Sequence, residues 1–196
     1  MSVAPLHTYF RRPSRPTIWS SRLLELYDYW DHKRHGRAAP GRAELDPADI
    51  PRLLPIVYLV DVTHSPLDFR FRLVGTEFCE KYGRDFTGER LVAVNKHDHR
   101  DEVLADYERC AALRVPVVSR RDFVNDLGVN WRYERILLPL CDDDGPVNML
   151  IGGMDIRIPL AEWRKLERLH GEDDGAPAPT PGVAGGDHQS GAPAPK

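Results

Sequence analysis

Segment 95–102 holds the residues best suited to metal chemistry, because two histidines, His97 and His99, lie among three carboxylates. Imidazole and carboxylate groups are common metal ligands, so this composition raises the prospect of a metal-dependent activity. Histidines two residues apart on a helix, however, point about 200° from each other and do not share one ion. A lysine and an arginine in the same segment also repel a cation. We interpret the segment as the solvated start of a helix and keep His97 and His99 only as weak candidates for metal ligands.

Motifs for nucleophilic catalysis and phosphate binding are missing from the sequence. No serine lies in a GxSxG motif, and Cys79, Cys110 and Cys141 lie far apart without a CxxC pair. Gly152-Gly153 lacks both a GxGxxG pattern and a Walker lysine, so in a strand it indicates a close approach of the backbone to another element. We therefore expect no catalytic residues and no enzyme, and the unpaired cysteines fit a reducing compartment.

The composition favours a single globular domain. The chain has 196 residues, 41% of them hydrophobic, and a net charge of −3, which allows a buried core but lacks the basic excess of a nucleic-acid-binding protein. Arginines and aromatic residues alternate in 119–122 and 131–135, but the interleaved acidic residues favour cross-strand charge pairs over a nucleic-acid surface. No apolar run approaches the ~20 residues of a membrane span, so we expect a cytoplasmic protein.

A helix is predicted over residues 19–35. Its apolar side chains recur at helical spacing and form one face: Trp19, Leu23, Leu26, Tyr27 and Trp30. Ser20 or Ser21 suits the N-cap and Gly36 suits the C-terminal end. This face must be covered, either by the chain's own sheet or by a second copy in a homodimer. We favour the first interpretation and keep the five residues as candidates for an interface.

The rest of the chain alternates between strand and helix patterns. Apolar runs predict strands at 56–62, 69–73, 115–124, 131–140 and 147–155. Helical patterns lie at 46–55, 76–83, 96–114 and 158–170, whereas 1–18 is expected to be a flexible arm and the Pro/Ala/Gly-rich segment 171–196 a disordered tail. Short turns between consecutive strands favour antiparallel pairing. The pattern predicts an α+β domain with a five-stranded antiparallel sheet and helices on one face.

Four stretches of sequence carry a family resemblance: DPADIPRLLP at 46–55, FRFRLVGT at 69–76, GRDFTG at 83–88 and ERILLPL at 134–140. In this order and spacing they resemble a bacterial family of stand-alone PAS domains, over residues 19–157 including the helix 19–35. The resemblance implies a sheet of spatial order 2-1-5-4-3, with helices enclosing a small cavity over one face and the first helix flanking the domain. It also implies a sensory or interaction role without catalysis.

The implied cavity has candidate lining residues on both strands and helices. They are Tyr58, Phe71, Phe78, Val103, Tyr107, Met149 and Ile151. The helical members are the more secure, because the side of a strand that a residue faces is easily misjudged by one position. Some PAS domains hold haem through a histidine on the helix that corresponds to the one predicted here at 96–114. In this chain His97 or His99 would then be the ligand. The sequence names no cofactor.

These observations predict a non-catalytic module in cytoplasmic signalling. PAS domains usually regulate an attached output domain, and residues 159–196 are too short to form one, so we expect a separate signalling protein as partner, with a homodimer as a further possibility. The alternative is a sensor of a small ligand in the cavity, with haem as one candidate. A metal-dependent enzyme built on 97–102 is the least favoured interpretation.

Overall fold

The computed structural model describes residues 15–94, 99–124, 130–142, 145–156 and 168. The predicted tail 171–196, most of the predicted arm 1–18 and the predicted helix 158–170 apart from Arg168 lie outside the described residues. The described helices are α1 (Ser21–Lys33), α2 (Thr76–Tyr82), α3 (Leu91–Val94) and α4 (Arg100–Leu113), with short 3-10 helices at Arg42–Glu44, Pro47–Asp49 and Leu54–Ile56. None of them has the length and apolar character to cross a bilayer within the described part of the chain.

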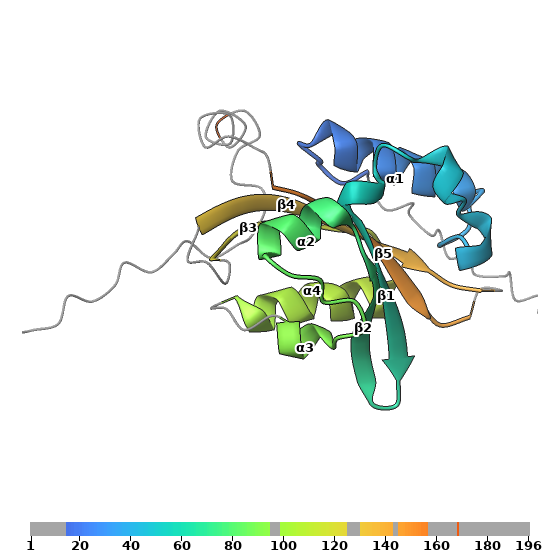
Figure 1. Ribbon diagram of the computed structural model, residues 1–196. Coiled ribbons are helices and arrows are strands. Elements are labelled where there is room, and N and C mark those ends of the chain that lie inside the picture. Colours follow the sequence, from blue (N-terminus) through green and yellow to red (C-terminus); the bar gives the residue numbers. More distant parts are fainter. Residues whose placement is uncertain (1–14, 95–98, 125–129, 143–144, 157–167, 169–196) are drawn as a thin grey trace, which may run out of the picture.

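The strands form one antiparallel sheet (Figure 1), in the predicted spatial order β2-β1-β5-β4-β3. They are β1 (Val57–His64), β2 (Leu67–Val74), β3 (Val117–Val124), β4 (Asn130–Leu140) and β5 (Met149–Asp155). The N-terminal half of the sheet and the C-terminal half join where β1 pairs with β5. The predicted fold class is therefore confirmed, and every predicted strand is present within three residues of its predicted ends.

Each face of the sheet carries its own apolar core. Helices α2, α3 and α4 cover one face and contribute Phe78, Leu91, Val103 and Tyr107 to its core. Helix α1 and the 3-10 helices cover the opposite face, as Figure 1 shows, with Leu23, Leu26, Trp30 and Leu53 buried there. The central strands β1, β5 and β4 are thus sandwiched, which explains their nearly continuous apolar sequences.

Helix α1 packs on its own sheet. Ser20 caps the helix by accepting a hydrogen bond from the Leu23 N–H at 3.3 Å, and Gly36 follows the helix with φ 82°. Leu23, Leu26, Tyr27 and Trp30 are buried against β4 and β5, and Trp19 is stacked under the Arg120 guanidinium at 3.9 Å. Leu23, Leu26, Tyr27 and Trp30 are thus covered within one chain, and Trp19 is partly buried.

Helix α4 buries a carboxylate beside its apolar residues. Asp106 lies between α4 and the sheet, on the side of the helix that also buries Val103, Tyr107, Cys110 and Ala111. Arginines on β3 and β4 supply the countercharge for Asp106. A carboxylate can be buried at such a position only because these partners come from elsewhere in the chain.

Candidate ligand cavity

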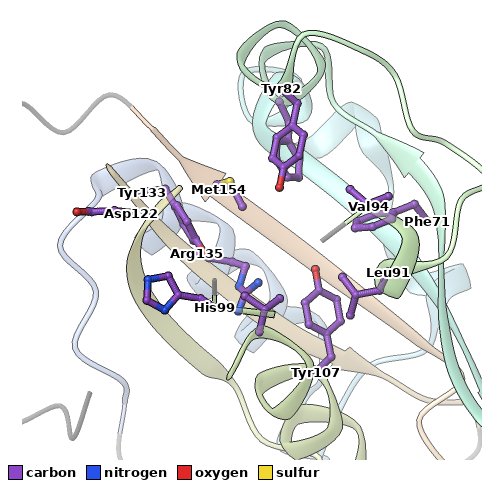
Figure 2. A pocket seen from close by; sticks show the side chains of 12 residues that line it. Phe71, Tyr82, Leu91, Val94, His99, Tyr107, Asp122, Tyr133, Arg135 and Met154 are labelled. Carbon is purple, nitrogen blue, oxygen red and sulfur yellow. The ribbon is translucent and has the colours of Figure 1, made fainter. Parts of the chain in front are cut away.

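A small cavity of about 40 Å³ lies between the sheet and helices α2–α4. Figure 2 shows the side chains that enclose it, which come from α2, α3, α4 and from strands β2–β5. The wall consists of Phe71, Phe78, Tyr82, Leu91, Val94, His99, Val103, Tyr107, Asp122, Tyr133, Arg135 and Met154. Most of these are apolar or aromatic, and a few polar groups are set among them, which is the usual composition of a ligand pocket.

Arg135 on β4 is the charged residue in the interior of this cavity. Its side chain is 3% exposed and its Nη2 lies 2.6 Å from Oδ2 of Asp106. The guanidinium also lies over the ring of Tyr107, 5.1 Å from the centroid. Its Nε–H is buried and has no hydrogen-bond partner among the described residues. A buried donor without an acceptor is costly, so this atom marks a place where an acceptor would be stabilised.

Asp106 also forms ion pairs with two other arginines. Its Oδ2 is also 2.6 Å from Nη1 of Arg121 on β3, and Arg109 approaches its other oxygen at 3.7 Å. Arg121 in turn reaches Glu102 at 3.3 Å. This group of three arginines and two carboxylates therefore carries one excess positive charge, and Arg135 is its most deeply buried cation.

Two tyrosine hydroxyls meet beside Arg135. The Tyr107 hydroxyl donates to the Tyr58 hydroxyl over a long 3.4 Å. Burial raises the pKa of Tyr58 well above its usual range. It raises the pKa of Tyr107 as well, although Arg135 acts in the opposite direction. Both groups consequently remain neutral hydroxyls at physiological pH, and Tyr107 can donate to an acceptor placed in the cavity.

Aromatic rings pack behind the part of the cavity wall that Phe71 and Phe78 form. Phe78 and Phe86 pack edge to face at 5.1 Å, and Phe71 and Phe86 do so at 4.7 Å. Tyr58 joins this group through Phe78 at 5.4 Å. Interlocked rings of this kind have few alternative rotamers, so the wall has a defined shape.

Half-exposed residues stand at one edge of the cavity. His99 lies 3.0 Å from Glu102 through Nδ1, and Asp122 pairs with Arg132 at 3.0 Å. The other candidate metal ligand, His97, lies outside the described residues. Within the described part of the chain, no three His, Cys, Asp or Glu residues are grouped so that they could hold a metal ion.

The structure places some of the predicted cavity residues on the cavity wall and others elsewhere. Phe71, Phe78, Val103 and Tyr107 lie on its wall, and Tyr58 lies behind Tyr107 in the same core. Met149 and Ile151 must be corrected, because both point to the opposite face and pack in the core beneath α1. The side of β5 was misjudged by one residue, and the β5 residue on the cavity wall is Met154.

Comparison with known proteins decides the family. A family model described as a PAS domain matches residues 19–155. The chain belongs to the PAS domain family. PAS domains are sensory modules, and the predicted resemblance is confirmed. No curated protein matches the sequence of this PAS domain.

Solved structures show the same fold. This PAS domain is similar to a light-oxygen-voltage domain studied with a flavin analogue, with a TM-score of 0.50 and 10% identity; the match covers 62% of this chain and 91% of that chain. It is also similar to the PAS domain of Bordetella pertussis BvgS, with 22% identity, a TM-score of 0.46, and coverage of 62% of this chain and 91% of that chain.

Arg135 and Asp106 are the charged residues in and beside the cavity that the sequence pattern did not assign to it. Arg135 and Glu134 stand at the start of the run ERILLPL, whose residues are all buried in the structure. An arginine inside such a run is the available signal, because a charged residue in a central strand has to find a buried partner.

Proposed function

We propose that this PAS domain is a non-catalytic sensory module that takes up a small molecule in its cavity and reports this occupancy to a separate protein partner. The single observation that carries the proposal is a cavity with aromatic walls and one buried, incompletely satisfied guanidinium, that of Arg135. Polar groups that converge in an otherwise apolar cavity are typical of specific ligand sites. The free thiols at Cys79, Cys110 and Cys141 support a cytoplasmic location.

The volume of the cavity limits the ligand. Sites for drug-sized molecules measure about 300–1,000 Å³, whereas this cavity measures about 40 Å³. A haem or a flavin therefore does not fit the cavity in this conformation, and His99 is engaged with Glu102. The proposal is for a ligand of a few heavy atoms.

The strands offer a short route from the cavity to the opposite face. Arg135 pairs with Met154 across β4 and β5, and both line the cavity. The next pair along the ladder, Glu134 and Asp155, points to the α1 side. Fully buried Glu134 accepts hydrogen bonds from the Trp19 and Ser20 N–H groups at 2.9 and 2.7 Å. A displacement of these strands by a ligand would reach the start of α1 through one residue.

Asp155 and Glu77 extend this connection. Asp155 accepts a hydrogen bond from the Ser20 hydroxyl at 2.6 Å. Arg22 bridges Asp155 at 2.8 Å and Glu77 of α2 at 2.9 Å. Helix α2 also contributes Phe78 to the cavity wall. The N-terminal end of α1 is thus tied to two elements that line the cavity, which makes α1 the element we propose to carry the output.

The test uses the full-length protein with a cavity-filling variant. Native and denatured mass spectrometry, followed by a thermal scan against a panel of small metabolites, should reveal a bound mass or a saturable rise in Tm with at least one compound. Val103→Leu adds a carbon to the cavity wall and should weaken that binding at least tenfold. Ala105→Leu, on the exposed side of the same helix, is the matched control and should bind like the wild type.

Two results would overturn the ligand part of the proposal: no compound binds to the wild type, or Val103→Leu binds as tightly as Ala105→Leu. The output part is tested by hydrogen exchange of α1 with and without the compound that binds. Unchanged exchange in α1 at saturation would remove α1 as the output element. Cross-linking in native lysate that recovers no protein above background would remove the separate partner.

A further inference from the structure

We propose that the cavity binds a small organic carboxylate through the guanidinium of Arg135, with the Tyr107 hydroxyl as a second donor. This inference rests on the proposed sensory function and names the chemical class of its ligand.

The buried charges beside the cavity favour an anion. Arg135 is almost fully buried and remains cationic, so it requires a negative partner nearby. The carboxylate it reaches, Asp106, lies equally close to Arg121 and is also approached by Arg109. Glu102 lies beyond Arg121, at 3.3 Å from it. Arg109 and Glu102 are about half exposed, so the buried part of the group, Arg135 and Arg121 against Asp106, has one excess positive charge that an anion in the cavity would neutralise.

Two hydrogen-bond donors lie on side chains that line the cavity. The Nε–H of Arg135 has no acceptor among the described residues, although Arg135 lines the cavity. The Tyr107 side chain also lines it, and its hydroxyl hydrogen, which among the described residues makes only the long bond to Tyr58 at 3.4 Å, can turn to a ligand. In Figure 2 the Tyr107 side chain points from α4 into the space beside Arg135. Two donors on adjacent sides of one space match the two oxygens of a carboxylate.

The volume and the apolar wall of the cavity limit the size of the ligand. A cavity of about 40 Å³ holds about three or four water-sized groups, since one water needs roughly 10–15 Å³. This suits the carboxylate of a two-carbon acid, with its methyl end against Phe78, Leu91 and Val103. The acidic residue on the wall, Asp122, pairs with Arg132 at the exposed edge and leaves the interior to the donors.

The experiment is calorimetric titration of the full-length protein with acetate and propionate at constant ionic strength. Acetamide is the neutral isostere and chloride the simple anion. Saturable binding of at least one carboxylate is expected, with acetamide at least 30-fold weaker and no saturable binding of chloride. Equal binding of acetate and acetamide, or of acetate and chloride, would overturn the proposal, as would no binding of either carboxylate.

Two arginine variants separate the site from the ion pair. Arg135→Gln and Arg121→Gln each remove one 2.6 Å partner of Asp106, but only Arg135 lines the cavity. Arg135→Gln should abolish carboxylate binding, whereas Arg121→Gln should retain it within about threefold. If Arg121→Gln weakened carboxylate binding as much as Arg135→Gln or more, the proposal would be overturned, and Arg135 would be assigned to pairing with Asp106 and a bound water.

A second pair of variants keeps the proposal testable if Arg135→Gln does not fold, which circular dichroism will show. Tyr107→Phe retains the buried ring and should weaken carboxylate binding five- to tenfold, and Val103→Leu should weaken it at least tenfold. Unchanged affinity in both variants would overturn the site. If neutral compounds bind in a manner that Val103→Leu abolishes while carboxylates do not bind, the carboxylate inference fails and the sensory function stands. If nothing binds, both fail.

Discussion

At Gly152 the backbone of β5 passes directly under the ring of Tyr58. A Cβ at this position would lie 2.1–2.5 Å from the Cζ, Cε2 and hydroxyl oxygen of Tyr58, and the fully buried ring has little room to move. We expect Gly152→Ala to lower the free energy of unfolding by about 1–3 kcal/mol, the usual cost of overpacking a core. Urea denaturation followed by circular dichroism measures this loss.

The control for Gly152→Ala is the same change in a Tyr58→Leu background. The ring is then gone, so the added methyl group should cost clearly less than it does in the wild type. Equal costs in the two backgrounds would contradict the clash, because residues in contact should show a coupling energy.

Buried tyrosines also determine how the stability should depend on alkaline pH. Burial raises the pKa values of Tyr58 and Tyr107 in the folded protein, so their contribution is complete below pH 10, the ordinary pKa of unfolded tyrosine, and is lost as the pH rises towards the folded values. At pH 11 ionisation stabilises the unfolded chain by about 1.4 kcal/mol for a tyrosine that stays neutral in the folded protein, and by less where the folded residue ionises too. We expect unfolding free energies measured from pH 9 to pH 11 to fall accordingly.

Tyr58→Phe and Tyr107→Phe provide the comparison for the alkaline titration. Each variant should lose one tyrosine's share of the pH dependence, since phenylalanine does not ionise in the unfolded chain. If the unfolding free energy of the wild type did not change up to pH 11, ionisation of these tyrosines in the unfolded chain would not be lowering the stability.

At the scale of single elements, α1 depends on burial of its apolar face for its position on the sheet. Leu23 is fully buried, and its Cδ2 would lie 2.8 Å from a Cβ added at Gly153. Leu23→Ala should therefore cost about 2–5 kcal/mol, as large-to-small changes in a core do. Thermal and urea denaturation measure the cost, and native mass spectrometry should show the same oligomeric state as in the wild type.

The matched control on the same helix is Glu25→Ala, whose side chain is exposed. It should change the stability by no more than about 0.5 kcal/mol. If Leu23→Ala instead left the stability unchanged and shifted a dimer towards monomer, the helix face would be an interface between copies and not part of the core.

The whole molecule has two cores that share one sheet, and each core contains a buried cysteine. Cys110 lies in the core under α4 and Cys141 in the core under α1. Because every central strand contributes to both cores, we expect one cooperative unfolding transition, as small single domains usually show. Thiol labelling across a urea series, with the modified cysteine located by mass spectrometry, should modify Cys110 and Cys141 over the same range of urea concentration.

The same labelling experiment in Leu23→Ala extends this prediction. Both thiols should become reactive at a lower urea concentration, by the same amount, although only the core around Cys141 was altered. Partly exposed Cys79 provides the internal reference for labelling in the folded state. Earlier labelling of Cys141 alone would show that the two cores unfold separately.

The sequence by itself determined the strands, the helices α1, α2 and α4, their order and the family, whereas α3 was not predicted and the helical pattern at 46–55 forms two short 3-10 helices. The stripe from Leu23 to Trp30 predicted α1, and the alternation in FRFRL predicted β2, because local periodicity reflects which side of an element is buried. Interleaved charges in 119–122 and 131–135 correctly predicted cross-strand pairs, such as Arg120 with Glu134. Gly152-Gly153 correctly indicated a close approach, with Tyr58 on one side and α1 on the other.

Only the tertiary structure decided which side of β5 faces the cavity and which charges lie inside it. Met149 and Ile151 were assigned to the cavity, but β5 is buried on both faces, so its apolar pattern carries no information about direction. Asp106 lies 29 residues from Arg135 in the sequence, and its burial follows from the docking of α4 on β3 and β4. Local sequence determines what each element is, whereas long-range packing determines which of its side chains meet.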